Sequence, residues 1–108
     1  MGPGVKVHRG RLLAVGNTIM GSTRGANVVA NGGEAVLEGN DIQGAKGDGI
    51  TSWNSCRMRL KQNRIHANSG FGVALNTDAA CSTIEDNTIW GNHEGQVVCR
   101  GHGQPGKR

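Results

Sequence analysis

A short pattern of apolar, polar and small residues recurs along the chain at an almost constant interval. The triplet Asn-x-Ile begins at Asn17, Asn40, Asn63 and Asn87, with spacings of 23, 23 and 24 residues. An apolar residue precedes each Asn by three positions, and a Gly or Ala follows each Ile by two positions. Self-similarity at such a period is typical of a solenoid, in which every coil repeats one structural unit.

A second apolar pattern, with a period of two, follows each small residue and predicts a strand with one inward face. The inward pairs are Ile50 with Ser52, Val73 with Leu75, and Val97 with Cys99. In the first unit two arrangements remain open, because either Asn27 points inward or a one-residue bulge presents Val28.

The repeat length restricts the fold, since it is too short for a pair of helices and the units hold too few leucines for a leucine-rich repeat. Each unit fits two or three short strands separated by turns, and each coil pairs with the next at about 4.8 Å. Parallel crossovers are overwhelmingly right-handed. The sequence therefore predicts an all-β fold, a right-handed single-stranded parallel β-helix of about four coils of 23–24 residues.

Stacking of the coils places equivalent residues in columns. The four Ile residues of the triplets should form an internal column, and the four Asn residues a hydrogen-bonded ladder. The Ile residues are Ile19, Ile42, Ile65 and Ile89. On the outside, Glu38, Lys61 and Glu85 share one offset, which predicts alternating charges on neighbouring strands. Asp41 and Arg64 should also lie side by side.

Composition supports this fold and limits the partners. The 108 residues include 19 Gly and 10 Asn, the two types that most readily adopt positive φ at tight corners. No apolar run approaches the roughly 20 residues of a membrane span, so no membrane partner is expected. The net charge is +4, but residues 31–95 contain five basic and all eight acidic residues. This split of the basic residues between the two ends argues against a nucleic-acid partner.

The chain divides into an N-terminal edge segment (1–11), the repeats (12–100) and a flexible basic tail (101–108). A short solenoid leaves unpaired backbone groups at both ends, which predicts self-association through the coil ends. Three cysteines, Cys56, Cys81 and Cys99, form neither a complete disulfide set nor a metal-binding spacing. With no secretory apolar segment recognised, they favour buried thiols and a cytoplasmic location, unless the chain is part of a longer protein.

The stretch Leu60–Leu75 and its repetition over Ile84–Asn92 resemble the right-handed parallel β-helix repeat of the pectate-lyase-like superfamily. The run Asn-x-Ile-x-x-Asn followed by Gly-Val is most similar to repeats of β-helix F-box proteins, substrate-recognition subunits of certain ubiquitin ligases. It is also similar to repeats of periplasmic carbohydrate-binding and sugar-hydrolase proteins. The resemblance, over residues 12–100, implies a protein partner or a polysaccharide. These residues contain no helical F-box, so a ligase role implies a longer protein.

Two short motifs resemble those of polygalacturonases in this superfamily, namely Asn76-Thr77-Asp78 and Gly101-His102-Gly103. The Asp pair that this resemblance requires one coil after Asp78 is replaced by Cys99-Arg100. Inverting glycosidases need two carboxylates about 6.5–9.5 Å apart. The acidic residues and histidines are spread over different offsets, which argues against a metal site. We therefore expect a non-catalytic module without a cofactor, with Asn76 and Asp78 as turn residues.

Both tryptophans are expected to face outward and are candidates for binding. Trp90 shares an outward column with His66, and Trp53 is a neighbour of Asn76. Exposed indoles suggest either stacking against a sugar or a protein contact, although each ring could instead pack over an adjacent Gly-rich turn. The candidate binding residues, for a protein partner or a polysaccharide, are Trp53, Trp90, His66, Asn76 and Asp78.

Overall fold

Three parallel sheets make up the computed structural model, which describes residues 5–8, 10–22, 25–53, 57–76 and 83–99. The first sheet contains β1 (Val5–His8), β4 (Val28–Asn31), β7 (Ile50–Trp53), β10 (Phe71–Asn76) and β13 (Gly95–Cys99). The second contains β2 (Arg11–Val15), β5 (Glu34–Glu38), β8 (Arg57–Lys61) and β11 (Thr83–Glu85). The third contains β3 (Thr18–Met20), β6 (Asp41–Gln43), β9 (Arg64–His66) and β12 (Thr88–Trp90).

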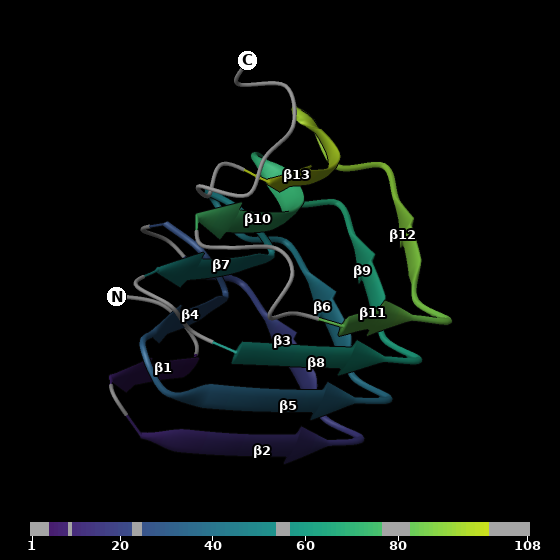
Figure 1. Cartoon of the computed structure of the whole chain (residues 1–108). Coiled ribbons are helices and arrows are strands. Elements are labelled where there is room, and N and C mark those ends of the chain that lie inside the picture. Colours follow the sequence, from purple (N-terminus) through teal and green to yellow (C-terminus); the bar gives the residue numbers. More distant parts are fainter. Residues whose placement is uncertain (1–4, 9, 23–24, 54–56, 77–82, 100–108) are drawn as a thin grey trace.

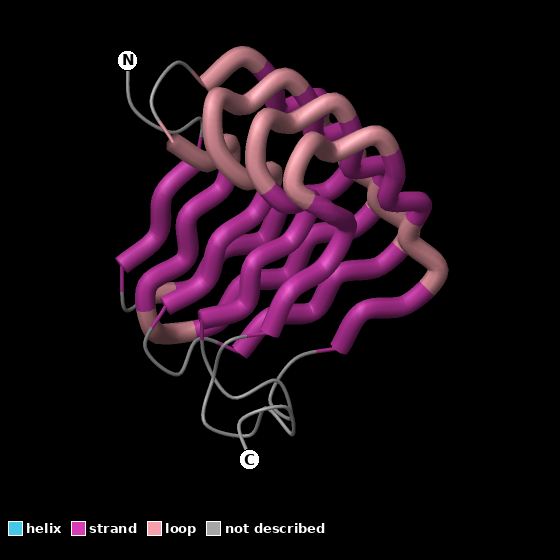
Figure 2. The backbone as a smooth tube through the Cα atoms, turned by 90° about the horizontal axis from the view of Figure 1, so that it is seen from above, coloured by secondary structure: helices cyan, strands magenta, loops and turns pink. Residues whose placement is uncertain are grey.

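The chain visits the three sheets in turn and rises by one strand with each coil (Figure 1). Figure 2 shows the loops of successive coils side by side along one edge. The prediction of an all-β parallel solenoid is confirmed. The predicted count of about four coils differs slightly, because the second and third sheets each hold four strands and thus three complete turns between first and last. Within the predicted edge segment, β1 pairs with β4.

The predicted column of isoleucines lies inside the solenoid. Ile19, Ile42, Ile65 and Ile89 pair in register across β3, β6, β9 and β12. Ile42 and Ile65 are completely buried, while Ile89 on the last strand is partly buried against the core. In the first unit Val28 takes the inward position opposite Ile50, as the second alternative proposed, but β4 pairs with β7 without a bulge. Asn27, the residue of the first alternative, is completely buried as well.

The predicted asparagine ladder is confirmed. The backbone N–H groups of Asn17, Asn40 and Asn63 each donate to the side-chain Oδ1 of the Asn one coil later, at 2.8, 2.9 and 2.8 Å. The Nδ2 of Asn63 also donates to the Leu37 carbonyl at 2.8 Å. The ladder satisfies polar groups that the narrow core excludes from water, and so it permits a fold with few large apolar side chains.

A second ladder, which the sequence interpretation missed, runs along the next corner. The N–H of Ala45 donates to Asn68 Oδ1 at 3.0 Å, and the N–H of Asn68 donates to Asn92 Oδ1 at 3.1 Å. Ala45 has no side-chain amide, and Asn27, one coil earlier and directly before β4, donates from Nδ2 to Asn68 Oδ1 at 3.3 Å. The burial of Asn27 thus compensates for the missing amide. The signal in the sequence was the repeated Asn-x-Ile-x-x-Asn run, whose second Asn is Asn68 or Asn92.

The small residues two positions after each Ile lie at corners with left-handed backbone geometry. Gly44 has φ of 73°, and Ala67 at the equivalent place has φ of 57°. A left-handed conformation strains residues that carry a Cβ, which explains why this corner otherwise holds Gly. The repeat therefore specifies where the chain turns as well as which residues form the core.

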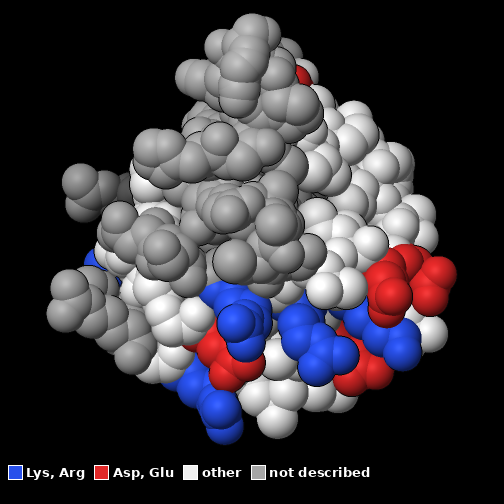
Figure 3. Space-filling view, in the orientation of Figure 1, with Lys and Arg blue, Asp and Glu red and all other residues white. Residues whose placement is uncertain are grey.

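Charged side chains alternate on the outer face of the second sheet (Figure 3). Glu38, Lys61 and Glu85 pair in register, as predicted, and so do Asp41 and Arg64 on the third sheet. Arg11 donates from Nε to Glu34 Oε1 at 3.1 Å in an exposed ion pair. Each exposed ion pair of this kind contributes only about 0–1 kcal/mol to stability. This charged face is therefore chiefly a solvent-exposed structural surface.

Candidate functional site

Two of the predicted binding residues meet on the outer face of the third sheet. The rings of His66 and Trp90 stack with their centroids 4.2 Å apart and their planes 4° from parallel. The stack follows from the register, since β9 and β12 pair His66 with Trp90. Trp90 remains 41% exposed, and therefore it can contact a partner. It packs on a side chain rather than over a glycine turn.

Charged groups surround this stack. His66 Nε2 and Asp41 Oδ1 are 2.9 Å apart, and Gln43 Nε2 donates to the same oxygen at 3.2 Å. The guanidinium carbon of Arg64 lies 6.0 Å from the centre of the Trp90 ring, within cation–π range. Asp41 thus contacts His66, two residues beyond its register partner Arg64. The sequence interpretation missed this diagonal contact, because register alone does not fix the direction of a side chain.

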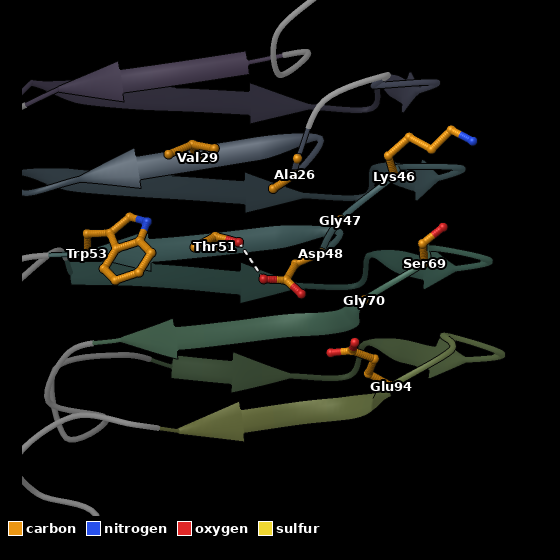
Figure 4. A pocket seen from close by; sticks show the side chains of 11 residues that line it. Ala26, Val29, Lys46, Gly47, Asp48, Thr51, Trp53, Ser69, Gly70 and Glu94 are labelled. Carbon is orange, nitrogen blue, oxygen red and sulfur yellow. Dashed lines mark hydrogen bonds between the residues drawn. The ribbon is translucent and has the colours of Figure 1, made fainter.

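Trp53 lies elsewhere, on the outer face of the first sheet beside a shallow groove of about 360 Å³ (Figure 4). The polar lining includes Lys46, Asp48, Thr51 and Glu94. Asp48 is occupied on both oxygens, since Oδ2 accepts from Thr51 Oγ1 and Oδ1 accepts from the Phe71 N–H, each at 2.8 Å. Asp48 is therefore a structural carboxylate, and the exposed groups Lys46, Trp53 and Glu94 are those able to meet a ligand.

Four of the predicted binding residues therefore form two pairs: His66 and Trp90 on the third sheet, and Trp53 and Asn76 on the first. Asn76 pairs in register with Trp53, as predicted, but it is the last residue of β10 and not a turn residue. The expectation that it lies in a turn was wrong, because β10 continues to that position. Asp78, the Gly101–Gly103 triplet, Cys56 and Cys81 lie outside the described residues. The predictions for these residues therefore remain predictions.

Residues 2–104 match a family model described as a right-handed beta helix region. The chain belongs to this right-handed β-helix family. No curated protein and no solved structure shows a significant match. Membership confirms the predicted hand of the coil, and the superfamily-level and F-box resemblances remain hypotheses.

In this β-helix, the described residues include no group of three or more His, Cys, Asp or Glu side chains arranged to hold a metal ion. Nor does any helix among them have the length and apolar character needed to cross a membrane.

The exposed apolar side chains of the β-helix gather at its two ends, a feature that the sequence interpretation did not use. Among the described residues, seven large apolar side chains are exposed, and six of them belong to edge strands of the three sheets. The edge strands are β1 to β3, here the first layer, and β11 to β13, here the last layer. The first layer exposes Leu13, Val15 and Met20, and the last exposes Ile84, Trp90 and Val97. Trp53 alone among the seven lies on a middle coil. The sequence contained a signal for this feature, because the first and last copies of the repeat identify the coils whose outward apolar residues lie at the ends.

Proposed function

We propose that this chain is a non-catalytic β-helix module that binds other polypeptides through the two ends of its solenoid. The observation that carries the proposal is the concentration of exposed apolar side chains in the first and last layers. Leu13, Val15 and Met20 are 69%, 57% and 60% exposed at one end. A hollow of about 470 Å³ at this end is lined by Val5, Leu12 and Ile19, among others.

Strand edges that no described residue pairs with can add directional hydrogen bonds to this apolar surface. β1, β2 and β3 each occupy one edge of their sheets, and β13, β11 and β12 occupy the opposite edges. Strand edges with apolar neighbours are ready sites for another chain to pair. A partner that recognises such an end is another polypeptide, including a second copy of this chain. Recognition of a substrate protein within a longer ligase subunit is one form of this role.

Light scattering over a range of protein concentrations tests the proposal. We expect the average mass to rise with concentration, because the ends that carry Leu13 and Val15 pair with one another. Replacing Leu13 and Val15 by Glu should reduce the association, since charges then oppose burial of that end. The Trp53→Ala variant is the control, because it removes an exposed apolar side chain that lies on neither end. A single monomeric mass at all concentrations, or equal association of all variants, would contradict the proposal.

Absence of polysaccharide cleavage is part of the same proposal. The observed geometry supports it, because the groove carboxylate of Asp48 already binds Thr51 and the Phe71 N–H. We expect neither reducing ends nor unsaturated products from pectin or polygalacturonate, and no effect of Asp78→Asn beyond a slight change in stability. Product release that Asp78→Asn abolishes would show that the chain is an enzyme.

A carbohydrate ligand is the second candidate, and the groove beside Trp53 favours it. An indole that is 45% exposed next to Lys46 and Glu94 offers a stacking surface with polar neighbours. Titration with defined oligosaccharides, followed by NMR, distinguishes this candidate. Binding that is lost in Trp53→Ala and kept in Trp90→Ala would support it.

A further inference from the structure

The C-terminal end of the solenoid is a step and not a flat face. β13 forms a fifth strand of the first sheet on top of β10, whereas the second and third sheets end at β11 and β12 (Figure 1). Within the described part of the chain, the next layer therefore exists over one sheet and is open over the other two. The open edges of β11 and β12 are adjacent, so one segment that forms a strand, a corner and a second strand would pair with both.

Among the described residues, the asparagine ladder ends at this step with the N–H of Asn87 as its last donor. In each earlier coil the backbone N–H of the ladder Asn donates to an Oδ1 in the following coil, as in Asn63 to Asn87 at 2.8 Å. No described residue supplies the next Oδ1 for the N–H of Asn87. A segment that places an amide side chain at this corner would continue the ladder.

Core columns also open onto the step. Ile84 is 37% exposed, although its register partner one coil earlier, Leu60, is completely buried. Ile89 is likewise only partly buried, whereas Ile65 beneath it is inaccessible. An added segment would thus pack one apolar side chain over each of these isoleucines.

The rim of the step is acidic. Described residues 83–99 carry Glu85, Asp86 and Glu94 and no Lys or Arg. In the outward column Glu38, Lys61 and Glu85 alternate in sign, so the next member that matches Glu85 is basic. Trp90 stacks on His66 and remains 41% exposed, which suits a further planar or cationic side chain.

We infer that this step binds an extended basic segment of a partner polypeptide, which adds one parallel strand to β11 and one to β12. The inference rests on the proposed function, of which it specifies one end and one partner chemistry. The segment has apolar side chains facing Ile84 and Ile89, an Asn or similar amide at the corner, and Lys or Arg on its outer face. Residues 100–108 contain no Val, Leu, Ile, Met or Phe, so they lack the apolar side chains that the site takes.

A peptide copied from the chain itself is the probe. The blocked peptide Arg-Met-Arg-Leu-Lys-Gln-Asn-Arg-Ile-His repeats residues 57–66, which pair with β11 and β12 on their inner edges. On the open edges it would place Leu over Ile84, Ile over Ile89, Lys beside Glu85 and an Asn oxygen at the Asn87 N–H. Its binding, with a fluorescent label, is followed by anisotropy as the 108-residue protein is titrated in.

We expect saturable binding that weakens about tenfold or more in Glu85→Lys and in Trp90→Ala, which corresponds to about 1.4 kcal/mol each. Two matched controls should bind within about twofold of the unmodified protein, given the usual error of such ΔΔG values. Glu38→Lys alters the same outward column two coils from the step, and Trp53→Ala removes the exposed indole of another sheet. A peptide with Ala in place of its Asn should also bind more weakly, because it cannot extend the ladder.

Three results would overturn the inference: absence of saturable binding, equal binding of a scrambled peptide of the same composition, or equal binding by Glu85→Lys. Displacement of the peptide by self-association of the protein would also overturn it, because a second copy would then be the occupant. Light scattering separates the two levels of the argument. If the chain self-associates through Leu13 and Val15 but ignores the peptide, the proposed function stands and this inference fails.

Discussion

Asn63→Ala is expected to lower the free energy of unfolding by about 2–5 kcal/mol, because it leaves several buried polar groups without a partner at about 1–3 kcal/mol each. Asn63 Oδ1 accepts from both the N–H and the Nδ2 of Asn40, at 2.9 and 3.0 Å. Its Nδ2 donates to the Leu37 carbonyl and to Asn87 Oδ1, at 2.8 and 3.0 Å. Alanine would leave the buried N–H of Asn40 without an acceptor, while Asn40 Nδ2 would keep only its bond to the Ala14 carbonyl at 2.9 Å. Denaturant unfolding at low protein concentration measures the change.

Asn17→Ala is the matched control for this prediction. Asn17 belongs to the same ladder but is exposed on the first coil, and its backbone N–H keeps its bond to Asn40. We expect a loss of less than about 1 kcal/mol. Equal losses for the two variants would show that ladder hydrogen bonds do not stabilise the core.

Ile65→Ala is expected to cost about 2–5 kcal/mol, since it removes three carbons from a position without solvent access. Ile65 is completely buried and pairs with Ile42 on one side and Ile89 on the other. The rigid backbone of neighbouring coils limits collapse of the cavity. The shift of the denaturation midpoint, at constant m-value, reports the loss.

Graded variants check the origin of that loss. Ile65→Val should cost only about 0.5–1.5 kcal/mol, because one methyl group is lost. Ile84→Ala should cost less than half as much as Ile65→Ala, because Ile84 is already 37% exposed. If Ile84→Ala destabilises as strongly as Ile65→Ala, the core is not organised in the columns described above.

Much of the fold was predictable because a solenoid makes its contacts between adjacent coils. A constant spacing of 23 or 24 residues therefore specifies the neighbours of Asn40 or Ile42 directly. The role of the buried Asn27 was harder to predict, since it depends on the absence of a side-chain amide at Ala45, in the corner after β6 of the next coil. Such compensation requires the geometry of a corner, which a column alignment does not contain.

The candidate site was predictable only in part, for a related reason. The shared column placed Trp90 beside His66, and the structure shows their rings stacked. The diagonal contact between His66 and Asp41 depends on side-chain rotamers, which the repeat leaves free. The repeat offsets had already placed Trp53 and Trp90 on different strands, and the structure shows that these strands, β7 and β12, belong to different sheets.

By itself, the sequence determined the coil length, the register and the residues that face inward. These follow from the period of the repeat, because each coil contacts only the coils before and after it. The tertiary structure alone decided which exposed groups act together. It joined His66 to Asp41, occupied both oxygens of Asp48 and left a step beyond β11 and β12. Those outcomes depend on where the sheets end and where side chains point in space, and a one-dimensional pattern specifies neither.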